Sequence, residues 1–191
     1  MMIDRRRFII GIAGSILATM TGGKAMAAAK SNIKTRVSLV NTSHRETGIK
    51  KAIELLGINP VKGKDVLLKP NFNSADHFPG STHNDTLVNL ILHLKRMGAK
   101  GITIGERSGP PDTVDVLKDK GVYDICEKLD VKLINFEELP PDQWLKVKPE
   151  QSHWINGFLV AKPVLDSETQ TIHSHSSWHL DHLHMWSHSF L

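Results

Sequence analysis

Apolar and polar residues follow one another along the middle of the chain in blocks that predict strands separated by helices. Between the strands, apolar residues recur at helical spacing, most regularly from Leu87 to Leu94. The predicted strands are Val37–Val40, Asp65–Lys69, Gly101–Gly105 and Val131–Ile134. Strands that alternate with helices favour parallel pairing with right-handed crossovers. The pattern therefore predicts an α/β fold, a three-layer sandwich around a mostly parallel sheet.

Local signals predict where the helices begin and end. Ser43 and Glu46 have the spacing of a capping box, which predicts a helix that begins there and ends at Gly57. Gly98 is expected to end the helix that contains Leu87 to Leu94. Asp112 is expected to cap the next helix.

The pattern changes in the last quarter of the chain. Trp144–Val147 and Gly157–Val160 are predicted to be short strands of a meander or an inserted hairpin. The periodicity is then lost, and residues 166–191 are rich in histidine, tryptophan and serine. We expect residues 35–165 to form the α/β domain and residues 166–191 to form an atypical tail outside its core.

The N-terminal segment has the features of an export signal. Arg5–Ile10 resembles the twin-arginine motif, and the apolar run that follows is shorter than the roughly 20 residues of a membrane-spanning helix. Ala25–Ala27 is a small-x-small cleavage site. We therefore expect residues 1–27 to be a signal peptide read by the twin-arginine export machinery, residues 28–34 to be a linker, and the protein to be periplasmic or otherwise exported. The alternative is an uncleaved anchor helix.

Charge and cysteine content exclude several classes of protein. The formal net charge of +4 arises mostly in the predicted signal, so the rest of the chain is nearly neutral. Its lysines are interspersed with acidic residues, which argues against a nucleic-acid partner. Cys126 is the single cysteine, so neither an internal disulfide nor an iron–sulfur cluster held by four thiolates of this chain can form. We expect Cys126 to be a buried core thiol.

Polar loops follow the second and third predicted strands, where ligands bind in open α/β sheets. The candidate ligand-binding residues are Lys69, Asn71, Asn73, Ser108 and Gly109. The lysine and asparagines offer donors to a carboxylate or phosphate, and the backbone N–H groups of the Ser-Gly pair are expected to approach the same anion. If the protein is an enzyme, Lys69 is the predicted electrostatic clamp and Glu106 the predicted proton acceptor. Neither loop has a glycine pattern for phosphate binding, so a dinucleotide is not predicted.

Structural explanations compete with these roles. Lys69 and Glu106 are also placed to form an ion pair across the strand ends, and asparagine is a common turn residue. His77 and His83 flank the first loop as weak metal candidates. The chain shows no nucleophile–base pair, which favours a non-catalytic binding or accessory module as the alternative function.

Three segments resemble the prokaryotic family called domain of unknown function 362: Val66–Asn71, Met97–Lys100 and Ile102–Gly109. The similarity runs from about Arg36 to Leu165. Family members have no settled activity, and many are associated with iron–sulfur clusters through an attached ferredoxin-like module. The resemblance therefore implies an α/β protein that acts beside a redox or metal cofactor or with a redox partner protein. It does not identify the cofactor, because this chain has no iron–sulfur ligand set.

The end of the chain departs from the family's pattern. Family members continue with further strands, whereas Ile172–His184 is rich in histidine. This departure resembles a frameshift and implies a truncated member whose sheet is incomplete at the C-terminus, at the extreme a non-functional fragment. The alternative is a metal-binding tail, for which His175, His179 and His182 are weak candidate ligands at helical spacing.

Overall fold

The computed structural model describes residues 36–149, 153–166 and 169–174. The predicted signal peptide, the linker and most of the histidine-rich tail lie outside the described residues, and so do His175, His179 and His182. Within the described ranges, no helix is long and apolar enough to cross a membrane.

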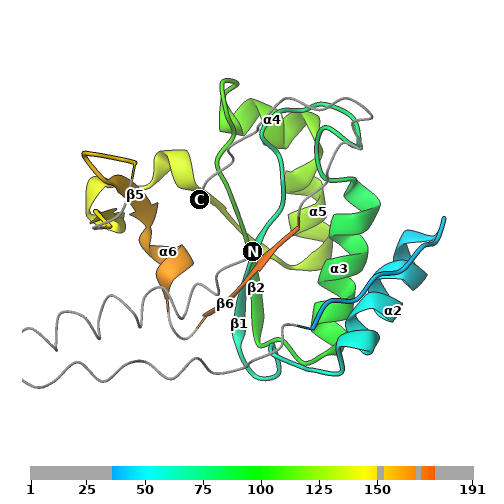
Figure 1. The fold of residues 1–191 in the computed structure, drawn as a ribbon. Helices are drawn as coiled ribbons and strands as arrows, with labels where there is room; N and C mark the ends of the chain where they lie inside the picture. The colour runs from blue at the N-terminus through cyan, green and yellow to red at the C-terminus, as the bar shows by residue number, and fades with distance from the viewer. Residues whose placement is uncertain (1–35, 150–152, 167–168, 175–191) are drawn as a thin grey trace, which may run out of the picture. The chain divides into compact units, whose positions relative to one another are not determined.

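A four-stranded parallel sheet organises the described residues (Figure 1). Its order is β3-β2-β1-β6, and every neighbouring pair is parallel. The strands are β1 (Asp65–Lys69), β2 (Gly101–Glu106), β3 (Lys132–Asn135) and β6 (Thr169–His173). The helices are α2 (Arg45–Leu56), α3 (Asn84–Arg96), α4 (Thr113–Asp119), α5 (Val122–Leu129) and α6 (Lys162–Leu165). The α/β fold predicted from the sequence is confirmed.

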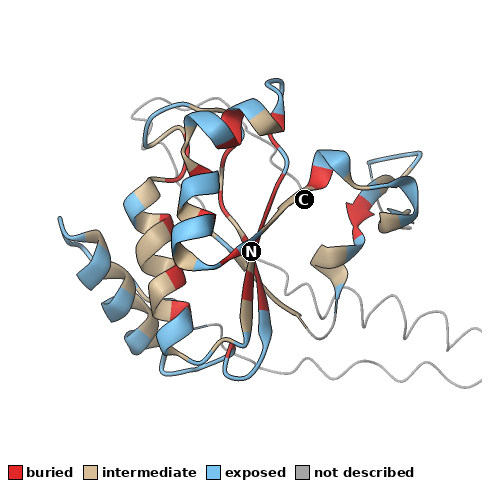
Figure 2. Cartoon of the chain, turned by 180° about the vertical axis from the view of Figure 1, so that it is seen from behind, coloured by how far each residue is buried: buried red, intermediate tan, exposed pale blue. Residues whose placement is uncertain are grey.

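Helices α3, α4 and α5 contribute to the apolar core on one face of the sheet, and α2 packs against α3 (Figure 1). Side chains alternate between the two faces of a strand, so every second residue of β1 and β2 enters this core. The core includes Val66, Leu68, Ile102 and Ile104 from the strands and Leu87, Ile91 and Leu94 from α3. Figure 2 shows the buried residues in the central strands and on the helices that cover them.

The other face of the sheet carries a smaller apolar cluster. Leu67 from β1 meets Phe136 from the short 3-10 helix η1 (Phe136–Glu138) and Ala161 from β5 (Phe158–Ala161). Strand β5 pairs antiparallel with β4 (Trp144–Val147), which confirms the predicted hairpin. A second 3-10 helix, η2 (Pro141–Gln143), leads into β4. The third layer is therefore a hairpin with the one-turn helix α6 instead of a row of long helices.

Two predictions near the N-terminal end of the domain are wrong. Val37–Val40 is not a strand, and the side chains of Val37 and Leu39 are 82% and 92% exposed. An alternating pattern alone cannot make a strand when no neighbouring strand pairs with it. Helix α2 begins one residue later than the capping box predicts, because its N-cap is His44, whose side chain makes no capping bond. Its end at Gly57 is confirmed, with a left-handed φ of 62°.

Strand β6 lies inside the segment predicted to be a tail outside the core. Thr169–His173 pairs along its length with β1, and Ile172 packs against the larger core. Its sequence is mostly polar, so it lacks the apolar run of a buried strand. Backbone hydrogen bonds between paired strands do not depend on the polarity of the side chains. They form β6 although its sequence does not have the apolar pattern that would predict a strand.

Gly105 is required where β2 passes beneath Phe136. A Cβ at this position would overlap the Phe136 ring and lie 3.0 Å from Leu67 Cδ1. We expect Gly105→Ala to lower the free energy of unfolding by about 1–3 kcal/mol in urea denaturation, because buried Phe136 must move. In the double variant with Phe136→Leu, the loss should be smaller than the sum of the two single losses.

Gly101→Ala is the matched control in the same strand. Its Cβ would meet Asp65 Oδ1, the end of an exposed side chain that can turn away. Equal losses for Gly105→Ala and Gly101→Ala would contradict the packing argument.

Candidate functional site

Each strand of the parallel sheet ends in a polar residue, and these ends share one edge. Lys69 of β1 lies opposite His173 of β6, and Glu106 of β2 lies opposite Asn135 of β3. In open α/β sheets this carboxyl edge is where ligands bind. The structure therefore brings the two predicted catalytic residues, Lys69 and Glu106, to the centre of that edge.

The Glu106 carboxylate is fully buried and hydrogen-bonded on both oxygens. Its Oε1 accepts from Lys69 Nζ in an ion pair and from the backbone N–H of Arg107 at 2.8 Å. Its Oε2 accepts from the backbone N–H of Phe72 at 2.9 Å. One side chain thus joins the end of β1 to the two loops that leave β1 and β2.

Burial raises the pKa of the Glu106 carboxyl, because the ionised form loses its contact with water. The charge of Lys69 and the hydrogen bonds from Lys69, Phe72 and Arg107 oppose this rise. The burial effect is the larger one. Glu106 is therefore a carboxyl group whose proton affinity is increased although a lysine pairs with it.

Lys69 is the exposed member of the ion pair. Its side chain is 27% exposed, whereas that of Glu106 is 0% exposed. Besides Glu106, its Nζ donates to Pro70 O at 3.1 Å. An ammonium group has three N–H donors, and the described residues provide acceptors for two of them.

The loop after β1 is fixed by its own hydrogen bonds and carries the two candidate asparagines. The backbone N–H of Asn71 donates to Thr82 Oγ1, and the N–H of Thr82 donates to Asn71 O, each at 2.8 Å. The Asn71 side chain makes one long hydrogen bond, from Nδ2 to Gly80 O at 3.4 Å. Asn73 is exposed. Both amide side chains lie in the loop that leaves Lys69.

Ser108 and Gly109 brace this loop, and their backbone N–H groups are already used. The N–H of Ser108 donates to Thr113 Oγ1 at 2.9 Å, and the N–H of Gly109 donates to Asn73 O at 3.0 Å. Ser108 Oγ donates to Phe72 O at 2.8 Å. In this structure the two N–H groups that we expected to approach an anion are bonded to Thr113 and Asn73, and the Ser108 hydroxyl is bonded to Phe72.

Phe72 and Thr113 are both fully buried beside the site, although the sequence does not single them out. The backbone of Phe72 is hydrogen-bonded to Glu106 and Ser108. Any residue type can make such backbone contacts, so the sequence does not reveal them. Thr113 follows Asp112, the predicted helix cap, whose side chain accepts from the N–H groups of Val114 and Asp115. That cap was the only sequence signal near Thr113.

Lys120, at the C-cap of α4, approaches the same loop from the other side. Its Nζ lies 5.7 Å from the centroid of the Phe72 ring and donates to Asp76 O at 3.2 Å. Burial lowers the pKa of the Lys120 ammonium, and nearby Asp76 opposes that shift.

The histidines of the first loop do not assemble a metal centre. Among the described residues, no group of three or more His, Cys, Asp or Glu side chains is placed to hold a metal ion. His83 instead caps α3, since its Nδ1 accepts from the backbone N–H of Asp85 at 3.1 Å. Cys126 is buried in the core, as predicted, and burial raises the pKa of its thiol to about 11.

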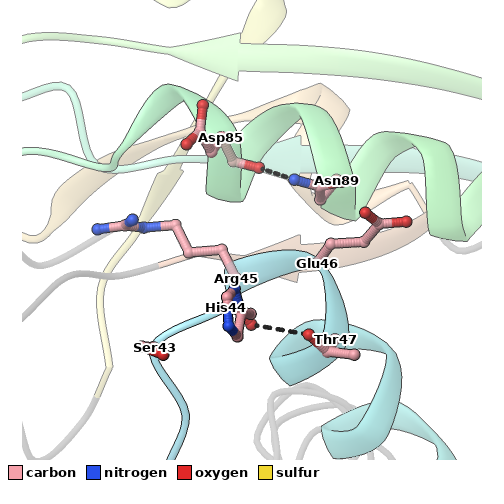
Figure 3. A pocket seen from close by; sticks show the side chains of 7 residues that line it. All are labelled: Ser43, His44, Arg45, Glu46, Thr47, Asp85 and Asn89. Atoms are coloured by element: carbon pink, nitrogen blue, oxygen red, sulfur yellow. Dashed lines mark hydrogen bonds between the residues drawn. The ribbon is translucent and has the colours of Figure 1, made fainter.

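A polar hollow of about 350 Å³ lies between the start of α2 and the first turns of α3 (Figure 3). It is lined by Ser43, His44, Arg45, Glu46, Thr47, Asp85 and Asn89. Thr47 Oγ1 donates to His44 O and Asn89 Nδ2 donates to Asp85 O, so part of this lining is bonded to its own helices. None of the residues predicted for the strand-end site lines this hollow.

The fold and the polar edge define an α/β protein with a candidate ligand site at the carboxyl ends of a parallel sheet. The family described as Domain of unknown function (DUF362) matches residues 66–172, more than half of the chain, and the protein belongs to this family. The match begins in β1 and ends in β6, so it includes Lys69, Glu106 and all the strands of the parallel sheet. No curated protein and no solved structure matches the chain.

Proposed function

We propose that this protein is exported by the twin-arginine route and binds a small anionic ligand at the carboxyl ends of β1 and β2. The observation that carries the proposal is the Lys69 ammonium, which is partly exposed at the polar edge and has acceptors for two of its three N–H donors among the described residues. The amide groups of Asn71 and Asn73 lie in the adjoining loop as further donors. Ser108 and Gly109 contribute indirectly by holding that loop.

In this proposal the members of the ion pair have different roles. Lys69 contacts the anion, and Glu106 orients Lys69 from the buried side. In a catalytic protein, Glu106 would also accept a proton, which its increased proton affinity favours. Action beside a redox or metal cofactor is the related hypothesis; it rests on the family resemblance and requires that a partner supply the cofactor.

A non-catalytic binding or accessory module is the second candidate. It is favoured by the engagement of both Glu106 oxygens, which leaves the carboxylate no direct contact with a ligand in this conformation. Binding of an anion without turnover by the purified protein would select this candidate over an enzyme.

We expect Lys69→Gln to weaken anion binding by about tenfold or more, because a hydrogen bond to a charged group is worth about 1.5–3 kcal/mol. Glutamine keeps an N–H donor for Glu106 but removes the charge. The measurement is calorimetric titration of the full chain with sulfate, inorganic phosphate and dicarboxylates.

Lys100→Gln is the matched control. Lys100 pairs with Asp65 at 3.3 Å, at the amino ends of the same two strands, and both side chains are well exposed. This variant should bind as the wild type does. Equal weakening by both substitutions, or no binding of any anion to the wild type, would contradict the proposed site.

A further inference from the structure

We propose that the strand-end site takes up a proton together with its anion, and that Glu106 holds that proton. The inference rests on the proposed function and adds a property of the ligand: an oxyanion whose binding is coupled to protonation of the protein.

A bound anion would change the balance of charge at the ion pair of Lys69 and Glu106. Lys69 and Glu106 form a neutral pair in the structure, joined through Nζ and Oε1. An anion bound at the exposed side of Lys69 is separated from the Glu106 carboxylate only by the Lys69 ammonium group, and the two have charges of the same sign. Like charges at such a distance favour the neutral form of the carboxyl group.

Glu106 has few ways to respond to a second negative charge beside Lys69. Its side chain is 0% exposed, so water cannot stabilise the ionised form. The backbone N–H groups of Phe72 and Arg107 hold the carboxylate from two sides, so it is not free to turn away from Lys69. The Glu106 carboxylate therefore responds to the bound anion by taking up a proton.

Other charged groups surround the ion pair of Lys69 and Glu106. Burial raises the pKa of Glu106, and the charge of Lys69 on β1 opposes this rise. The other titratable groups on the surrounding elements are Arg107 after β2, Asp76, His77 and His83 in the loop after β1, Lys120 at the end of α4, Glu137 in η1, and His173 of β6, which lies opposite Lys69. Asp76 Oδ2 accepts from Ser74 Oγ, and Glu137 Oε2 accepts from the Thr113 N–H. Neither carboxylate contacts Lys69 in place of Glu106.

The hydrogen bond between Lys69 and Glu106 gives the proton its route. The ammonium transfers one proton from Nζ to Oε1, and the partly exposed amine then takes a proton that the acid form of the buffer supplies through water. Only N–H and O–H bonds change, and nothing is oxidised or reduced. In the product, the bound anion has replaced Glu106 as the counter-ion of Lys69.

The sign of the pH dependence follows from this exchange. Between the pKa of Glu106 in the free protein and its higher pKa in the complex, the complex carries one more proton than the free protein. Raising the pH therefore drives dissociation, and the affinity should fall by up to about tenfold per pH unit until the pKa of Glu106 in the complex is reached.

The test is calorimetric titration of the full chain with sulfate, whose own charge does not change near neutral pH. The titration is run at one pH in two buffers of different ionisation enthalpy, and the difference in heat gives the number of protons taken up. We expect close to one proton per anion. Binding with the same heat in both buffers would overturn this inference while leaving the proposed function intact, whereas no binding would overturn both.

Two variants locate the proton. Glu106→Gln should bind sulfate without proton uptake and with an affinity independent of pH. Asp65→Asn, in the exposed ion pair at the opposite ends of the strands, should take up the proton as the wild type does. Proton uptake that persists in folded Glu106→Gln would assign the proton to another group and refute the role of Glu106. If Glu106→Gln fails to fold, the two-buffer experiment on the wild type still decides whether a proton is taken up.

Discussion

Glu106→Ala is expected to lower the free energy of unfolding by about 3–5 kcal/mol, because it removes one partner of a buried ion pair and leaves buried donors without acceptors. The N–H groups of Phe72 and Arg107 both lose their acceptor. The charge that remains on Lys69 costs less than a fully buried one, since its side chain is 27% exposed. We therefore expect a value near the lower end of the range.

The measurement is urea denaturation followed by circular dichroism, with Asp65→Ala as the control. Asp65 and Lys100 form an ion pair across the same two strands at their amino ends, where the Asp65 side chain is 52% exposed. Exposed pairs contribute little, so this control should lose less than about 1 kcal/mol. Similar losses in the two variants would show that the buried carboxylate does not hold the loops together.

Phe72→Ala is expected to have an effect of similar size, about 3–5 kcal/mol. Phe72 belongs to a loop, yet its side chain is 0% exposed and packs in the larger core. Its removal leaves a cavity and also frees the backbone groups that bind Glu106 and Ser108. We therefore expect sulfate binding to weaken together with stability.

Phe78→Ala is the matched control for this prediction. Phe78 lies in the same loop but is 51% exposed, and it contacts Arg45 and His83 at the surface. Its loss should cost less than about 1 kcal/mol and should not change sulfate binding. A Phe72→Ala protein as stable as Phe78→Ala would contradict the anchoring role of Phe72.

The fold was predicted best where local signals and burial agree. Helix α3 has an apolar stripe with a glycine just beyond its end, and Asp112 caps α4 as expected. The prediction failed for Val37–Val40 and for β6, because membership of a sheet depends on a neighbouring strand, which for β6 lies far away in sequence. The regular pattern of Val37–Val40 was not sufficient to form a strand, and the polar composition of β6 did not prevent its pairing with β1.

The ion pair of Lys69 and Glu106, the structural alternative to a functional role, is confirmed, whereas the contacts around it were not predicted. Lys69 and Glu106 were expected to meet because adjacent parallel strands end at the same edge, and they do. Glu106 is the buried member of the pair, and its Oε2 accepts from the backbone N–H of Phe72. The internal use of the Ser108 N–H group depends on Thr113, five residues further along the chain. Such contacts between backbone and distant side chains are not encoded in any short motif.

The strand order also sets a sequence of events during synthesis of the chain. Strand β1 gains β2 as a neighbour once Glu106 has been made, but its other neighbour, β6, is encoded by Thr169–His173. Residues 107–168 must therefore be made before β6, and one side of β1 remains without its described partner during that time. Long-range pairing of this kind forms slowly. Because the twin-arginine route that we propose carries folded proteins, the chain would have to complete this late pairing in the cytoplasm before it is exported.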